Sequence, residues 1–448
     1  MKLSLSILFI MIFCLGSITA QKINYEKSLE KAKSLASQQK KPLAILITVE
    51  TKVFIPTIQN SLNNEKVIEK FNRSFINYKA DWADTAASGK IMKEYKITQL
   101  PSFIFLDAKG GLLFTNIAIL AQPQSILGLA EKAISASQEK SLAEYDSVYA
   151  LGDYSTDFLK QYILRRERAG IINNAELIEK YVLGLKVSDL NNYGEVLFIL
   201  KAGPAVDGNA YKLAYLNRSL IDSIFRTEPL SDRTALNNAM ISNTMNSAIA
   251  NKSFTRAMAA ANFTRSTWAN NSIEGQKNWN LKIMQYYKAI NDTNKYLQQA
   301  SSHYEQYYMR LTVDSVRKRD SLNFILARNN AREISRININ DTTIRRTFSF
   351  TYSKDGYATE LNNAAWIFYQ MAVNKNDYLF KAMLWSRRSI ELSPKPAFYD
   401  TYAHLLYSLK FFDEAESMQK KAIELGNASK TDTRLFQEEY EKIKKRRL

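Results

Sequence analysis

Residues 100–118 read LPSFIFLDAKGGLLFTNIA, two apolar runs on either side of a short polar turn. SFIFL and LLFTNI each have the length of a strand and consist mainly of aromatic, aliphatic and β-branched residues. Between them, Lys109-Gly110-Gly111 is a turn signal, because glycine adopts backbone conformations that other residues avoid. The stretch therefore predicts two consecutive strands joined by a turn.

The segments before and after this pair complete an α/β pattern. PLAILITV at 42–49 is a continuous apolar run, as expected for a central strand that is covered on both faces. FINYKADW at 75–82 alternates apolar and polar residues, as a second strand does. The expected order is helix, strand, helix, strand, helix, strand, strand, helix. Helical periodicity marks residues 25–39, 65–71, 85–95 and 123–137.

This order of elements, together with LPSFIFLD at 100–107, resembles the thioredoxin-like fold, and in particular its secreted or periplasmic branch. The resemblance covers residues 23–137. In that family a cis-proline precedes the third core strand and faces the active site, so the resemblance implies this place for Pro101.

The stretch LITVETKVFIPTI at 46–58 is similar to the place where the family carries its reactive WCxxC dithiol, but it contains no cysteine. Counting back from NNEKVIEKF places Thr51 and Phe54 where the two cysteines would stand. Thiol-disulfide exchange requires a thiolate, and Cys14 is the only cysteine in the chain. Thr51 would need a neighbouring base to act as a nucleophile, and no histidine is near it in sequence. We therefore expect no catalytic residue, and a vestigial peptide-binding edge made of Thr51, Phe54, Leu100 and Pro101.

The first twenty residues, MKLSLSILFIMIFCLGSITA, have the layout of a secretory signal peptide. Lys2 precedes an apolar run, and small residues precede Gln21, so we expect cleavage after Ala20. The alternative is a membrane anchor, for which the run is short. Cleavage would remove Cys14 and leave a periplasmic or secreted protein without an integral membrane span.

The chain carries 61 Lys and Arg against 44 Asp and Glu, a net charge of +17, which favours anionic partners. Export argues against nucleic acid as that partner. The one dense basic run, KIKKRRL at 442–448, is expected to be a frayed, solvated end of a C-terminal helix or tail over 429–448. His303 and His404 are the only histidines, and their separation predicts no metal site and no cofactor.

Helical periodicity dominates the chain after residue 137. Only 14 glycines and 8 prolines occur in 448 residues, far below average use, which favours long helices. Segments between 157 and 203 follow one another with short Gly or Asn breaks, as helix pairs do. The sequence leaves open whether residues 138–357 contain degenerate copies of a repeat.

A repeat is visible near the C-terminus, where AMLWSRRSIELSP at 382–394 matches AESMQKKAIELGN at 415–427 with an offset of 33 residues. This period, with small residues where two helices touch, resembles the tetratricopeptide repeat over 358–428. Gln370 and Asn427 depart from the family pattern. The resemblance implies packing positions for Trp366 and Tyr399 (bulky, first helix), Ala382, Ala415 and Ala422 (small, second helix) and Pro394 (the terminating proline).

Stacked helix pairs present a concave face that binds peptides and proteins. We therefore expect a non-catalytic, exported protein that binds a protein or peptide partner in the cell envelope. Two alternatives remain open from the sequence: a thioredoxin-family thiol-disulfide oxidoreductase or envelope folding factor, and adhesion to anionic envelope polymers.

Overall fold

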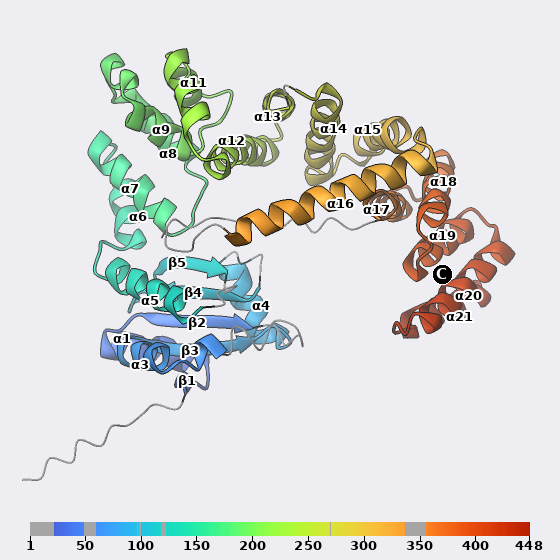
Figure 1. The fold of residues 1–448 in the computed structure, drawn as a ribbon, viewed down its shortest axis with the longest axis horizontal. Helices are drawn as coiled ribbons and strands as arrows, with labels where there is room; N and C mark the ends of the chain where they lie inside the picture. Colours follow the sequence, from blue (N-terminus) through green and yellow to red (C-terminus); the bar gives the residue numbers. More distant parts are fainter. Residues whose placement is uncertain are drawn as a thin grey trace, which may run out of the picture. The chain divides into compact units, whose positions relative to one another are not determined.

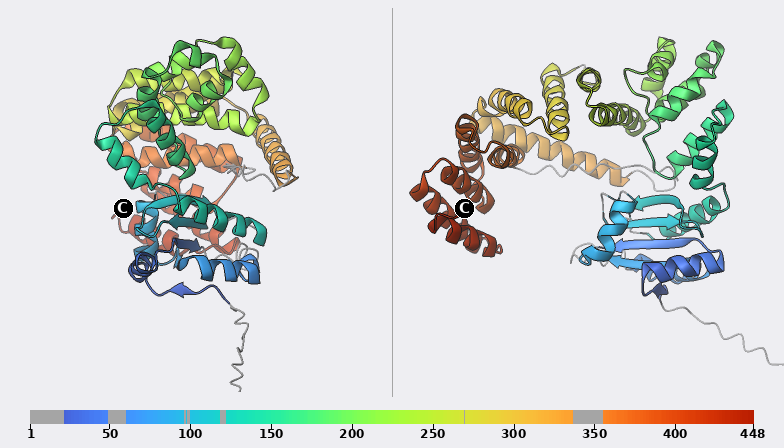
Figure 2. Two further views of the ribbon diagram at one scale, coloured as in Figure 1. Left: turned by 90° about the vertical axis from the view of Figure 1, so that its left-hand side faces the viewer. Right: turned by 180° about the vertical axis from the view of Figure 1, so that it is seen from behind.

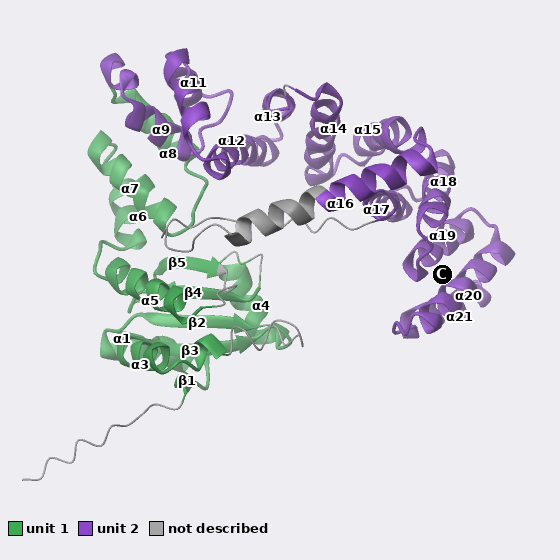
Figure 3. Ribbon diagram, viewed as in Figure 1, with its two compact units in different colours: residues 1–185 green, residues 186–448 purple. Residues whose placement is uncertain are grey.

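The computed structural model describes residues 22–48, 60–95, 97, 100–117, 122–268, 270–336 and 355–448, with the side chains of 326–336 excepted. Figure 1 labels the helices and strands, and Figure 2 shows the same ribbon from two further sides. The chain divides into two compact units, residues 1–185 and 186–448 (Figure 3). The predicted signal peptide, residues 1–20, lies outside the described residues.

Unit 1 is built on a five-stranded mixed sheet with the order β1-β3-β2-β4-β5. β3 runs parallel to both of its neighbours, β1 and β2, whereas β4 is antiparallel to β2 and to β5. The apolar run predicted to be a central strand is β2, and all its residues but the last are buried. The strands are β1 (Tyr25–Glu26), β2 (Leu43–Thr48), β3 (Ile76–Asp81), β4 (Ser102–Leu106) and β5 (Leu112–Ile117).

Helices cover both faces of this sheet. Side chains alternate between the two faces along each strand, so neighbouring residues of β2 pack against different helices. Ala44 and Leu46 of β2 pack in one cluster with α3 (Glu65–Ser74) and α5 (Pro123–Ser137). Leu43, Ile45 and Ile47 of β2 pack in a second cluster with α1 (Leu29–Gln39) and α4 (Thr85–Glu94). The predicted mixed α/β arrangement of this region is confirmed. Three further helices belong to unit 1: α6 (Leu142–Ala150), α7 (Thr156–Arg168) and α8 (Ala175–Leu183).

The first predicted helix starts later than the sequence indicated. Tyr25 and Glu26 form the short strand β1, which pairs in parallel with Asn77 and Tyr78. The Ser28 side chain then accepts a hydrogen bond from the Lys31 backbone N–H at 3.2 Å and so caps α1. The prediction of a helix from residue 25 was therefore wrong for its first four residues.

The turn between β4 and β5 is closed by Asp107. Its Oδ1 accepts hydrogen bonds from the backbone N–H groups of Lys109 and Gly111, both at 2.8 Å. Gly110 has φ of +88°, and a Cβ on Gly111 would lie 2.4 Å from the Asp107 carboxylate. Both glycines are thus required, as the turn prediction implied.

A buried arginine secures the open edge of the sheet. Leu113 is an extra residue in the β4–β5 pairing, and β5 has no strand on its other side among the described residues. Arg165 of α7 is only 1% exposed, and its guanidinium donates to the carbonyl oxygens of Leu113 (3.2 Å), Leu112 (3.4 Å) and Lys140 (3.3 Å). These bonds tie α7 to the sheet and occupy carbonyls that another strand would need.

Unit 2 is helical throughout its described residues, which confirms the predicted helical remainder. Consecutive helices from α12 to α15 and from α17 to α21 pack on one another. The helices are α9 (Tyr193–Lys201), α10 (Asn209–Ala214), α11 (Arg218–Thr227), α12 (Leu230–Ala250), α13 (Phe254–Ser266), α14 (Ser272–Ala289), α15 (Thr293–Tyr304), α16 (Val313–Arg336), α17 (Gly356–Met371), α18 (Asn376–Leu392), α19 (Pro396–Ser408), α20 (Phe412–Ala428) and α21 (Arg434–Lys444); η1 (Val187–Asn191) is a 3₁₀ turn and η2 (Glu305–Met309) a π-helical turn.

Several of the turns between these helices share one geometry. A residue with positive φ follows α12, α14, α19 and α20, and a backbone bond from the next residue reaches back to the helix, as from Phe411 to Leu406 at 2.9 Å. This is the left-handed cap that reverses a chain within a few residues. The residues with positive φ are Lys252, Asn291, Lys410 and Lys430.

One buried cluster joins α14 and α15 to α17, α18 and α19. Trp385 of α18 and Phe368 of α17 meet at its centre, with ring centroids 4.7 Å apart. The helices near residues 272–304 therefore belong to the same stack as the predicted repeats. Within the part of the chain that the structure covers, no helix is both long and apolar enough to cross a bilayer.

Candidate functional site

The peptide bond between Leu100 and Pro101 is cis, at the position where the resemblance implied a cis-proline. Pro101 is buried and directly precedes β4, whose first residue, Ser102, pairs with Ile47 near the end of β2. Leu100 is half-buried and packs against the cluster on the α1 and α4 face. Thr51 and Phe54 lie outside the described residues, so the four-residue binding edge stays a prediction.

The predicted repeat-packing residues lie on α17–α20, except Pro394, which lies between α18 and α19. Ala382, Ala415 and Ala422 are fully buried at helix contacts, as small residues at such positions should be. Trp366 and Tyr399 lie on the first helices of the two pairs and are half-buried, and Pro394 is exposed two residues after α18 ends.

The largest buried side chain of this region, Trp385, was not singled out from the sequence. Its Nε1 donates to Glu305 Oε1 at 2.7 Å, which ties α18 to the π-helical turn.

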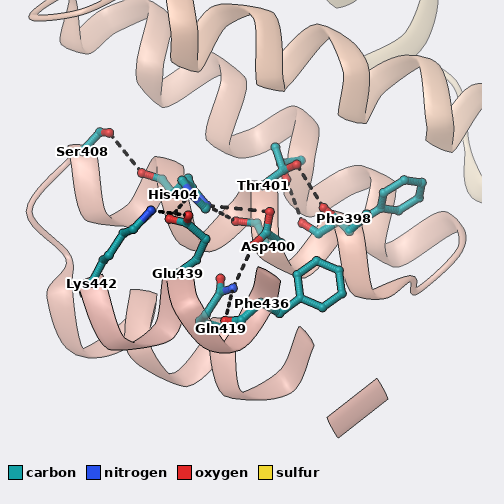
Figure 4. A network of polar contacts seen from close by, with 11 residues as sticks. Phe398, Asp400, Thr401, His404, Ser408, Gln419, Phe436, Glu439 and Lys442 are labelled. Carbon is teal, nitrogen blue, oxygen red and sulfur yellow. Dashed lines mark hydrogen bonds and ion pairs between the residues drawn. The ribbon is translucent and has the colours of Figure 1, made fainter. Parts of the chain in front are cut away.

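A buried polar network lies among α19, α20 and α21 (Figure 4). His404 Nδ1 donates to the Asp400 carbonyl oxygen at 2.8 Å, and Nε2 lies 3.4 Å from Glu439 Oε2. Its ring is buried between those of Trp366 and Tyr369, each with its centroid 5.3 Å away. Both ring nitrogens are thus engaged and the ring is enclosed, which makes His404 a packing residue and not an accessible general base.

Gln419 connects the three helices of this network. It is fully buried, and its Nε2 donates to Asp400 Oδ1 of α19 at 2.7 Å and to the Phe436 carbonyl oxygen of α21 at 3.1 Å (Figure 4). Burial raises the pKa of the Asp400 carboxyl above its usual range, and the Gln419 hydrogen bond opposes that rise. The network fixes α21 onto α19 and α20.

The C-terminal end is consequently not the frayed, solvated tail predicted for residues 442–448. Ile443 is fully buried, and the Leu448 backbone N–H donates to the Tyr407 hydroxyl at 3.3 Å. Phe436, Tyr440 and Ile443 recur at helical spacing and form the face that docks. In the sequence, the surrounding basic residues made this apolar face hard to recognise. The cationic side chains of the basic run are exposed in the structure.

The second histidine, His303 of α15, is fully buried without polar partners. Within the described chain, neither ring nitrogen has a hydrogen bond, and the rings of Tyr304, Tyr307 and Tyr308 surround it with centroids at 5.1, 5.3 and 5.8 Å. Burial, together with the charge of Lys277, lowers the pKa of His303 to about 4. The imidazole is therefore neutral near pH 7.

Comparisons with known proteins give little beyond this geometry. No protein-family model matches the chain, and no curated protein matches it by sequence. A solved structure described as "DsbH Oxidoreductase" is similar over 27% of this chain and 89% of its own, with 17% identity and a TM-score of 0.24. A TM-score this low supports no conclusion about function. The description of the chain as a mixed α/β unit followed by a helical unit rests on its own strands and helices.

Replacing Gln419 by leucine should lower the free energy of unfolding by about 2 kcal/mol, because Asp400 and the Phe436 carbonyl would lose a buried donor. Urea unfolding followed by circular dichroism measures this change. Gln437→Leu, the same substitution at an exposed position of α21, should stay within about 0.5 kcal/mol of wild type. Equal effects of the two substitutions would contradict the bridging role of Gln419.

His303 should make the protein less stable as the pH falls. An unfolded histidine has a pKa of about 6.5, so between that pH and about 4 the unfolded chain takes up a proton that the folded chain excludes. The free energy of unfolding should fall across this window by up to about 3 kcal/mol. His303→Phe removes this contribution, so urea midpoints at pH 7 and pH 4.5 should differ less than in wild type; an unchanged difference would count against the assignment.

Proposed function

We propose that the protein is an exported, non-catalytic binding protein that holds a protein or peptide partner on the helical repeats of unit 2. In this proposal unit 1 is a thioredoxin-like domain that has no active-site cysteines. The single observation that carries the proposal is a pair of exposed aromatic side chains at the junction of the two repeats.

Support for the thioredoxin-like assignment comes from unit 1 itself. The order of the described elements and the cis Leu100–Pro101 bond agree with what the resemblance implied. The sheet has a parallel pair β2–β3 and antiparallel strands β4 and β5, and helices cover both of its faces. No cysteine occurs after residue 14, so this chain supplies no thiolate to unit 1. A binding role for the edge at Pro101 fits this composition better than a redox role.

Support for the tetratricopeptide-like assignment comes from α17–α20. The 33-residue offset relates two successive helix pairs, and Ala382 and its counterpart Ala415 are both fully buried. Ser389 and its counterpart Ala422 are fully buried as well. Small side chains at these four positions allow the paired helices to approach closely, which is the physical content of the repeat pattern.

The exposed pair consists of Phe380 on α18 and Phe411 directly before α20. They are 42% and 41% exposed, and their ring centroids lie 6.4 Å apart. Leu384, one helical turn after Phe380, is 46% exposed. Adjacent exposed aromatic and aliphatic side chains are typical of protein interfaces, where buried aromatic rings contribute most of the binding energy. The net charge of +17 favours a partner that is acidic around its own apolar contacts.

The double variant Phe380→Ser/Phe411→Ser should lose most of its partner. Each aromatic anchor contributes about 1–2 kcal/mol or more in such interfaces, so retention should fall at least about tenfold. Chemical cross-linking and pull-down from a cell-envelope extract, read by mass spectrometry, measures this loss. The matched control Leu230→Ser/Leu435→Ser removes two still more exposed apolar side chains of unit 2 and should retain the partner.

Two outcomes would overturn the proposal. Wild-type protein that cross-links to no envelope protein has no such partner, and a patch variant that retains it as well as wild type does not bind through Phe380 and Phe411. An insulin-reduction assay addresses the oxidoreductase alternative, because turnover above background would show that unit 1 is catalytic. Binding to anionic polymers that collapses with modest salt would instead favour adhesion through net charge.

A further inference from the structure

A small cavity of about 190 Å³ lies in unit 1 between β5, the end of α5 and α7. Leu113 and Phe114 of β5, each only 1% exposed, lie at its base, and Ala136 adds an apolar group. Lys132, Arg165 and Arg168 add three cationic groups to the lining. The volume exceeds the approximately 150 Å³ of a cavity known to hold a benzene molecule. Its size and its walls are therefore suited to a ligand with a small apolar body.

The positive charge of this cavity is only partly neutralised. Glu139 is the one carboxylate of its lining, and it is paired with Arg168 at 2.8 Å. Arg165 donates only to backbone carbonyls, and no carboxylate of the described chain lies within ion-pair distance of it. The three cations and one anion leave a local excess of two positive charges.

Lys132 is the group best placed to bind a ligand. It is half-buried, and its Nζ lies over the Phe114 ring, 4.6 Å from the centroid. Across the described residues it has no hydrogen bond or ion pair, so its three N–H donors are available. Burial and the nearby Arg168 charge lower the pKa of Lys132, and an anion beside it would offset both effects.

We infer that this cavity binds a small monocarboxylate with an apolar group, which places its carboxylate on Lys132 and its apolar body against Leu113 and Phe114. The excess positive charge selects an anion. The apolar walls select a carboxylate with a hydrocarbon body over inorganic phosphate, whose oxygens would all need donors. Such a ligand is either a free acid or the C-terminal end of a polypeptide with an apolar last residue. This site is independent of the partner surface on unit 2.

Isothermal titration of the full chain with sodium benzoate at constant ionic strength tests the site. Benzoate should bind at millimolar concentration or below, whereas benzamide, which has the same shape without charge, and sodium phosphate should not. Lys132→Gln should weaken benzoate binding at least about tenfold, because it removes a charge-assisted hydrogen bond. The control Lys79→Gln removes one exposed charge from β3 and should bind benzoate as wild type does.

The source of the carboxylate follows from a second pair of probes. N-acetyl-phenylalanine presents a chain-end carboxylate, and N-acetyl-phenylalanine amide lacks it. If the former binds at least as tightly as benzoate and the amide does not bind, the ligand is a polypeptide end; if only benzoate binds, it is a free acid. The inference is wrong if benzoate does not bind, or if benzamide or phosphate binds as tightly as benzoate. It is also wrong if Lys79→Gln weakens benzoate binding as much as Lys132→Gln does. The unfolding temperature of each variant is measured to check that its fold is intact.

Discussion

The buried guanidinium of Arg165 is the interaction on which the organisation of unit 1 depends. A charge removed from water is costly unless its hydrogen bonds are made, and here three backbone carbonyls accept from it. Two of those carbonyls, of Leu112 and Leu113, belong to the edge strand at its irregular pairing. α7 is thereby fixed beside the sheet, so the compact unit extends well beyond α5. Because Arg165 donates to carbonyl oxygens and, among the described residues, to no carboxylate, its own positive charge is not neutralised beside the neighbouring cavity.

Unit 2 is stabilised mainly by contacts between helices that are close together in the chain. Several of its helices are joined through left-handed turns and pack through small residues such as Ala382 and Ala415. Some of its buried polar groups bridge helices, as Gln419 does among α19, α20 and α21. Phe380 and Phe411 differ from these packed side chains, because their rings lie side by side and both are exposed, with Leu384 exposed one turn from Phe380.

Much of this architecture could be predicted from the sequence because it depends on local patterns. Three features depend on residues that are close together in sequence: the apolar run of β2, the glycine turn between β4 and β5, and the 33-residue offset. The place of the cis-proline followed from the resemblance. The features that could not be predicted depend on partners far away in sequence. β1 is two residues long and exists only because β3 lies beside it, and Arg165 lies in the charged run RRER, where nothing distinguishes a buried arginine from a solvated one. The docking of α21 was hidden by its basic residues, and the cavity at Lys132 requires β5, α5 and α7 together.

The short turns of unit 2 and the long-range pairings of unit 1 have opposite consequences for how the chain acquires its structure. α19 and α20 need only the turn at Lys410 to meet, so helix pairs of this kind can form in small local steps. The sheet instead requires Tyr25 to find Asn77, and its edge is not secured until Arg165 reaches Leu112 and Leu113. During synthesis β5 therefore stays open to other chains until more than 50 further residues have been added, at rates of roughly 5–20 residues per second. Between the appearance of β5 and that of α7, the chain thus presents an edge strand whose carbonyls Arg165 does not yet occupy.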